Sequence, residues 1–166
     1  EICVRLEGEG ARCRLNGAYL MRNTQHCDNT TVIEHLKPET SCREVFKGVL
    51  DDRSRGVFQG RIVVHRGADK TDGHQLSKAL LLSDGAEIDA KPELEIYADD
   101  VKCSHGATAG DIDEQALFYL RARGIPEERA RGLLIQAFLD EALDQVGIPA
   151  LHEALLSRVA AWLGER

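Results

Sequence analysis

The stretch "GRIVVHRGADKTDGHQLSKALLLSDGAEIDAKPELEIYA", residues 60–98, sets short apolar runs between clusters of turn-forming residues. The runs "GRIVV" and "ALLL" are apolar, and Leu94, Ile96 and Ala98 alternate with Glu95 and Tyr97, which is typical of β-strands. The segments "HRGADKTDG", "SDGAE" and "AKPE" carry the Gly, Asp and Pro that turns favour. This stretch therefore predicts several short strands in succession.

The same pattern extends back to the first residue and forward to about residue 110. Ile2, Val4 and Leu6 alternate with polar neighbours, and strands restart about every ten to twelve residues. This spacing fits a sandwich, a barrel or a stacked solenoid such as a parallel β-helix. The asymmetric apolar patches favour stacked rungs, although no strict internal repeat is visible. We therefore predict a mainly β fold whose core is a parallel β-helix.

After residue 110 the apolar pattern changes to helical spacing. Asp111 and Glu114 resemble a capping box, and Gly124 lies where a C-terminal cap belongs, so a first helix of about three turns is expected between them. Further helices are expected over residues 126–147 and from Pro149 onward. The second is marked by Ala130, Leu133, Leu134, Ala137, Phe138 and Glu141, and the third by Leu151, Leu155, Val159, Trp162 and Leu163. A C-terminal helical domain over residues 111–166 is the result.

Composition and charge exclude several kinds of partner. The formal net charge is -7 and the basic residues are scattered, which argues against nucleic acid and anionic membranes as direct partners. The five cysteines form an odd set without a C-x-x-C pair, a pattern that favours free thiols and a cytoplasmic location. The chain opens without Met directly into strand-like alternation, so we expect a fragment of a longer protein.

Few residues suggest chemistry. A nucleotide-binding phosphate loop, H-E-x-x-H and G-x-S-x-G are all absent from the sequence. If "VKCSH" is a strand, Cys103 and His105 project from one face, and a thiolate with an imidazole suits iron, copper or zinc. Two ligands do not complete a site, and spacing alone favours the plainer alternative, in which Cys103 fills the core and His105 lies at a strand end.

Other candidate groups are weaker still. Core positions are expected for the remaining cysteines, which are Cys3, Cys13, Cys27 and Cys42. His26, Cys27 and His35 could lie on one surface, but no ligand spacing supports a metal site there. The segment "GADKTDGH" holds Asp69, Lys70, Asp72 and His74. A solvated turn is the favoured interpretation; the alternative is the cleft of a stand-alone β-helix enzyme acting on a saccharide or polyanion.

Three segments resemble a known family. They are "NTTVIEHLKPETSCREVFKGVL" (residues 29–50), "GVFQGRIVVHRGADKTDGHQLSKALLLSDGAEIDAKP" (56–92) and "KPELEIYADDVKCSHGATAGDIDEQALFYLRARGIPEERARGLLIQAF" (91–138). Together they resemble the C-terminal region of the SufB/SufD family of the SUF iron–sulfur cluster assembly system. The SufD branch is the better match, because SufB-like chains carry a cysteine ligand at a position that aligns with Leu76.

The resemblance implies a fold and a role. The expected fold is a right-handed parallel β-helix, of which residues 1–110 would be the C-terminal part, followed by the helical domain. The expected role is that of a scaffold rather than an enzyme. Members pair with a SufB-like paralogue through the ends of their β-helices, and their helical domain docks the ATPase SufC, here expected around residues 126–146. The fragment could also form a homodimer through its open first rung.

The resemblance also selects one ligand. His105 matches the family histidine proposed to bind iron or a cluster at the SufB interface, and Cys103 is its neighbour in the same motif. The other ligands would come from the partner chain. We therefore expect no cofactor bound stably by this chain alone, but transient binding of iron or a nascent cluster together with the partner. A metal-storing protein, by contrast, would bind iron tightly by itself.

Overall fold

The fold comes from a computed structural model, which describes residues 1–144 and 146–164. In these residues eight strands are followed by three helices. The strands are β1 (Ile2–Leu6), β2 (Arg12–Met21), β3 (His26–His35), β4 (Ser41–Leu50), β5 (Arg55–Val64), β6 (Asp72–Leu81), β7 (Glu87–Ile96) and β8 (Lys102–Gly110). The helices are α1 (Glu114–Ala122), α2 (Glu127–Leu143) and α3 (Pro149–Gly164).

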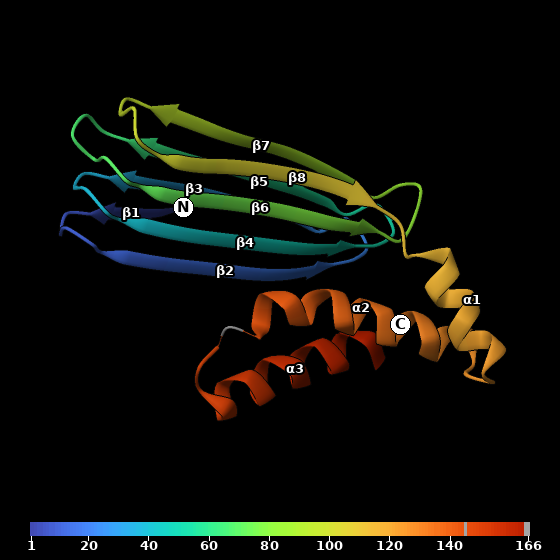
Figure 1. The fold of residues 1–166 in the computed structure, drawn as a ribbon. Helices are drawn as coiled ribbons and strands as arrows, with labels where there is room; N and C mark the ends of the chain where they lie inside the picture. Colours follow the sequence, from blue (N-terminus) through green and yellow to red (C-terminus); the bar gives the residue numbers. More distant parts are fainter. Residues whose placement is uncertain (145, 165–166) are drawn as a thin grey trace.

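Consecutive strands alternate between two sheets. The odd sheet has the order β1-β3-β5-β7 and the even sheet the order β2-β4-β6-β8, and every pairing is parallel. In the even sheet Ser41 lies opposite Asp72, which lies opposite Lys102. The chain thus winds as a solenoid with one strand of each sheet per rung (Figure 1). The predicted parallel β-helix is confirmed, and the sandwich and barrel alternatives, whose strands are mainly antiparallel, are excluded.

One corner of the solenoid repeats from rung to rung. The turn that precedes each of the strands β2, β4 and β6 contains one residue with a left-handed backbone. These residues are Gly10, Glu39 and Lys70, with φ of 68°, 59° and 58°. The corners stack, since the Gly10 N–H donates to Pro38 O at 3.1 Å and the Glu39 N–H donates to Asp69 O at 2.9 Å. Glycine adopts this conformation without strain, whereas Glu39 and Lys70 do not. The stacked hydrogen bonds, with a Lys70–Glu39 ion pair at 3.1 Å, hold both residues in it.

The core lies between the two sheets, because alternate residues of each strand point inward. One buried cluster contains Tyr19, Met21, Phe46, Leu50, Phe58, Ala79 and Ala86, and another contains Leu6, Ile33, Cys42, Ile62, Val64 and Ala68. The rings of Phe46 and Phe58, from opposite sheets, lie 5.1 Å apart between centroids. The interior is therefore a packed core along most of its length.

The helices cover part of the outer face of the even sheet. Leu20, Val49 and Leu80 form one outward row across β2, β4 and β6. This row joins Ile135 and Leu139 of α2 in a single cluster, and α2 lies alongside β2 and β4 with α3 beside it (Figure 1). The helices and the sheet thus share a core.

The change from strand to helix falls between Gly110, where β8 ends, and Glu114, where α1 begins. The division into a β-helix part at 1–110 and a helical domain at 111–166 stays a prediction, and residues 145 and 165–166 of that range lie outside the described residues. Within residues 1–144 and 146–164, no helix combines the length and the apolar character that crossing a membrane requires.

Several details of the predicted helices are wrong. The N-cap of α1 is Asp113, whose carboxylate accepts from the N–H groups of Gln115 and Ala116; Asp111 accepts only from the next N–H. The reason is that Ile112 is buried, which holds Asp111 in the strand-to-helix connection, two residues before the capping position. Helix α2 ends at Leu143 rather than near residue 147, and its apolar face is displaced, because packing against the even sheet buries Ile135 and Leu139. Leu133 is 42% exposed and Leu151 is 46% exposed.

Lys47 anchors α2 to the even sheet. Its side chain is 2% exposed, and its ammonium donates to Phe138 O at 2.8 Å and pairs with the Glu141 carboxylate. The same ammonium lies 4.4 Å from the centroid of the Phe138 ring. The Glu141 side chain is 56% exposed, and Lys47 lowers the pKa of its carboxyl. In this ion pair the Lys47 side chain is thus buried, whereas the Glu141 side chain is exposed.

This asymmetry predicts unequal mutational effects. Glu141→Ala leaves a buried cation with little compensation and is expected to lower the free energy of unfolding by about 2 kcal/mol, less than for a fully buried pair. Lys47→Met leaves only an exposed carboxylate and keeps most of the packing volume, so its effect should be smaller. Urea denaturation measures both, with the exposed Glu153→Ala as the control. A larger loss for Lys47→Met than for Glu141→Ala would contradict this account.

Candidate metal-ligand site on the last rung

Cys103 and His105 lie on β8, the edge strand of the even sheet. Cys103 packs with Cys13 and Cys42 against the inner core, and residues two apart in a strand share a face, so His105 belongs to the inward rows as well. Cys103 is half-buried, whereas His105 is exposed. The exposure follows from the edge position, because β8 has a strand neighbour on the β6 side only.

A buried polar row lies behind His105. Across the even sheet its register partners are Leu15, Glu44 and Gln75. Glu44 is 1% exposed and Gln75 is 2% exposed, and the Gln75 Nε2 donates to Glu44 Oε2 at 2.7 Å. Burial raises the pKa of the Glu44 carboxyl above its usual value. The candidate ligand therefore sits at the open end of a row of polar side chains inside the solenoid.

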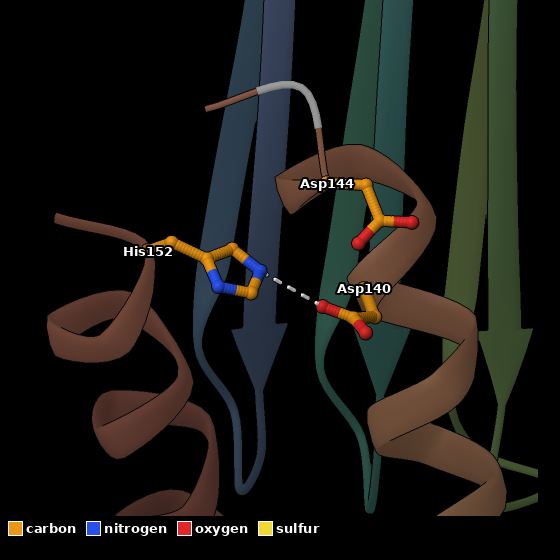
Figure 2. A group of neighbouring side chains, drawn as sticks. All are labelled: Asp140, Asp144 and His152. Atoms are coloured by element: carbon orange, nitrogen blue, oxygen red, sulfur yellow. Dashed lines mark hydrogen bonds and ion pairs between the residues drawn. The ribbon is translucent and has the colours of Figure 1, made fainter. Parts of the chain in front are cut away.

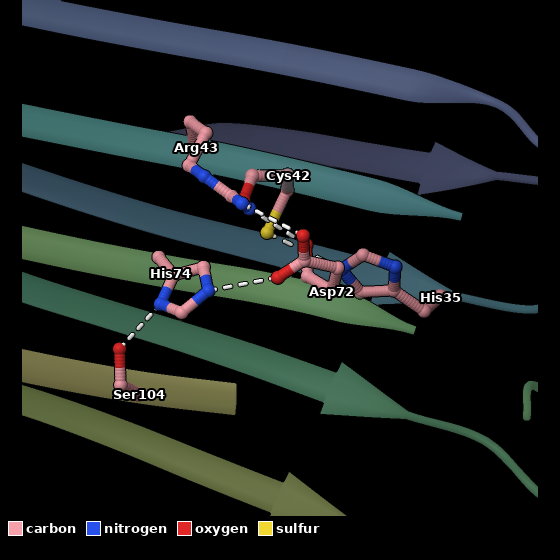
Figure 3. Close-up of polar contacts among 6 residues, drawn as sticks. All are labelled: His35, Cys42, Arg43, Asp72, His74 and Ser104. Atoms are coloured by element: carbon pink, nitrogen blue, oxygen red, sulfur yellow. Dashed lines mark hydrogen bonds and ion pairs between the residues drawn. The ribbon is translucent and has the colours of Figure 1, made fainter. Parts of the chain in front are cut away.

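A hydrogen-bonded network lies on the opposite, outward face of the same strands (Figure 3). Arg43 donates to Asp72 Oδ2 at 2.7 Å, His74 contacts Asp72 Oδ1 at 2.8 Å through Nε2, and the other ring nitrogen of His74 bonds to Ser104. The hydrogen bond from Arg43 lowers the pKa of the Asp72 carboxyl. This network ties β4, β6 and β8 together immediately beside His105.

The four residues of "GADKTDGH" therefore do not converge on one cleft. Asp72 and His74 belong to the sheet network, while Lys70 pairs with Glu39 at the corner and Asp69 is exposed. The turn interpretation holds for Asp69 and Lys70. For Asp72 and His74 it is wrong, because both lie in β6.

A buried imidazole–thiol pair was not foreseen. His35 is fully buried, not on a surface, and its Nε2 lies 3.3 Å from Cys42 Sγ (Figure 3). Its Nδ1 lies 2.8 Å from Thr40 Oγ1. Burial lowers the pKa of His35 to about 4 and raises that of Cys42 to about 12. The available signal was the Cys13–Cys42–Cys103 row, which requires the strand register. All five cysteines are free, and Cys3 is exposed, contrary to the core position expected for it.

A second group of metal-type donors joins α2 to α3. Asp140, Asp144 and His152 each offer a ligand atom within 4.8 Å of the others, and His152 Nε2 lies 3.2 Å from Asp140 Oδ1 (Figure 2). Asp140 and His152 are partly buried and Asp144 is exposed. The Asp140–His152 pair, which becomes an ion pair when the imidazole is protonated, accounts for the group as a contact between the two helices.

The family model and the similar proteins found by comparison all point to one family. The family model "SUF system FeS cluster assembly, SufBD core domain" matches residues 1–138. The iron–sulfur cluster assembly protein SufD of Escherichia coli is 42% identical over 156 residues, which cover 94% of this chain and 37% of the relative. A SufBD family protein of Synechocystis is 40% identical over 136 residues, covering 82% of this chain and 30% of the relative.

A more distant relative extends the comparison. The iron–sulfur cluster assembly protein SufD of Plasmodium falciparum is 31% identical over 160 residues, covering 95% of this chain and 11% of that protein. The chain thus spans between about a tenth and two fifths of the length of these three relatives. The activity and the partners of the full-length relatives therefore do not follow for this chain from the match alone.

Proposed function

The chain belongs to the SufBD core family of the SUF iron–sulfur cluster assembly system, and on that basis we propose that it acts as a scaffold in cluster assembly, pairing with a SufB-like paralogue and docking a SufC-like ATPase. Its relatives are named as assembly proteins, which supports a scaffold and gives no support to a stand-alone enzyme acting on a saccharide.

The observation that carries the proposal is the position of His105. It is exposed on β8, and β7 and β8 are the edge strands of the two sheets at the same end of the solenoid. Edge strands present unpaired backbone groups that suit pairing with another chain. A partner's β-helix end placed here would bring its side chains close to His105.

Iron or the growing cluster is the cargo in this proposal. His105, with Cys103 as a second candidate, contributes an imidazole and a thiol, the donors that suit iron. On this rung the chain offers only those two, and a cluster needs more ligands than that. The partner completes the set, so cargo binding at His105 is transient and depends on the complex.

Docking of the ATPase is proposed on the helices. A groove of about 860 Å³ runs between α2 and α3, lined among others by Pro126, Arg131, Leu133 and Leu163. Leu133 is 42% exposed, so an apolar side chain is presented within a rim of charged ones. An apolar centre with a polar rim is the usual anatomy of a protein interface.

A pull-down of the full-length protein with SufB and SufC tests both contacts. Deletion of residues 111–166 should remove SufC, but it also exposes the core that the helices share with Leu20 and Val49. A point variant is sharper: Leu133→Glu should weaken SufC retention about tenfold or more while SufB is retained. Leu151→Glu, equally exposed but outside the groove, is the control. Unchanged SufC binding by Leu133→Glu would exclude this docking site.

A further inference from the structure

Gln75 carries a buried amide oxygen that accepts no hydrogen bond. The side chain is 2% exposed and lies between Glu44 and His105 in the inward row of the even sheet. Its Nε2 donates to Glu44 Oε2 at 2.7 Å, whereas its Oε1 is buried and has no hydrogen-bond partner among the described residues. Buried acceptors without a donor are costly and rare in native proteins, so this oxygen is expected to gain a donor in the working complex.

The amide of Gln75 is held from two sides. Gly60 of β5, in the opposite sheet, provides the space for it, because a Cβ atom built on Gly60 would lie 2.1 Å from Gln75 Nε2 and 2.6 Å from its Cδ. Glu44 sets the orientation of the amide. Only the nitrogen of an amide can donate, so the Glu44 oxygen draws the nitrogen end towards β4.

This orientation turns the oxygen of the amide away from Glu44. The oxygen and the nitrogen diverge from one carbon atom, so the oxygen points to the side that does not hold the nitrogen. Strand β6, which carries Gln75, lies between β4 and β8, and the neighbour of Gln75 on the β8 side is His105. Neighbouring strands lie about 4.8 Å apart, so the amide oxygen is within reach of the His105 ring.

We infer that Gln75 is a positioning residue for His105: when one ring nitrogen of His105 binds iron or the cluster, the other donates its hydrogen to Gln75 Oε1. The inference rests on the ligand role proposed above for His105. Histidine ligands almost always donate their second ring N–H to an oxygen, which fixes the orientation of the ring. His105 is exposed in the chain by itself, and the hydrogen bond forms when the partner covers the last rung and the ring turns inward.

The metal affinity of the complex tests this role. The full-length protein, assembled with SufB and SufC, is titrated anaerobically with Co²⁺, and the part of the absorption that His105→Ala removes is assigned to His105. Gln75→Met keeps most of the side-chain volume but removes the acceptor, so this part should bind Co²⁺ about tenfold more weakly. In the His105→Ala background Gln75→Met should have no further effect on Co²⁺ binding, because the two residues act as one unit.

Variants that keep Gln75 itself test the orientation of its amide. Glu44→Gln retains an oxygen that can accept from Gln75 Nε2 and should keep the wild-type affinity for Co²⁺, whereas Glu44→Met releases the amide and should weaken binding as Gln75→Met does. Gly60→Ala should also weaken it, because the added methyl group pushes the amide aside. Gly110→Ala adds a methyl group to β8 where nothing lies within 4 Å and is the matched control. Circular dichroism checks that each variant is folded.

The outcomes separate this inference from the role of His105. Wild-type affinity in Gln75→Met, or an equal loss in the presence and absence of the His105 side chain, would overturn the inference and leave the ligand role of His105 intact. If His105→Ala changes no Co²⁺ binding at all, the ligand role fails and the positioning role of Gln75 fails with it.

Discussion

Replacing His105 with Ala in the full-length protein is expected to lower the yield of assembled clusters about tenfold or more when it is reconstituted with SufB and SufC, while the complex should remain intact. The side chain is exposed on the edge strand, and no described residue hydrogen-bonds to its ring. Removal of the side chain should therefore change the stability of the fold little, so a loss of cluster yield would report on binding of iron or the cluster. Cluster yield is measured by the absorbance of the reconstituted complex, and assembly by size-exclusion chromatography.

Two further variants sharpen that experiment. His26→Ala removes another exposed histidine, from β3 in the odd sheet, and should leave the yield unchanged. His105→Cys replaces the proposed imidazole ligand by a thiol, another cluster ligand, and should recover part of the lost yield, which a merely structural histidine would not show. A wild-type yield from His105→Ala would refute the ligand role and leave the scaffold proposal to the pull-down.

Replacing Phe58 with Ala is expected to lower the free energy of unfolding by about 4 kcal/mol, the largest stability change foreseen here. Phe58 is fully buried between the sheets and stacks near Phe46. The truncation removes apolar burial and leaves a cavity, because the two sheets are held apart by their other side chains.

Phe118→Ala is the matched control for this effect. Phe118 is 74% exposed on α1, so the same chemical change should alter the unfolding free energy by less than about 0.5 kcal/mol. Urea denaturation followed by circular dichroism gives both values. Equal losses for Phe58→Ala and Phe118→Ala would mean that the interior packing described here is wrong.

Much of the fold could be predicted because it depends on local patterns. The alternation at Leu94 and Ile96 marks a strand, and the turn residues between runs place the corners. Asp111 shows where local reasoning fails: two aspartates stand two residues apart, and only the burial of Ile112 decides that Asp113 is the cap. Helix faces were displaced for a similar reason, since tertiary packing selects among apolar residues that repeat in sequence.

The site was less predictable because it depends on register. Cys103 and His105 share a face by strand geometry alone, so that pair could be found. Cys42 and Gly73 become neighbours of Cys103 only once β4, β6 and β8 are aligned. His35 comes from the other sheet and reaches Cys42 around a corner. These contacts join different strands, so the spacing of residues within one strand cannot predict them.

The edge position of β8 has a consequence for motion. In a stack of rungs each strand is stabilised mainly by its nearest neighbours, and β8 has one strand neighbour where β4 and β6 have two. Its amide hydrogens should therefore exchange with solvent through low-energy local openings, while those of the inner strands stay protected. The strand that carries Cys103 and His105 is thus better able than the inner strands β4 and β6 of its sheet to adapt its position to an incoming ligand.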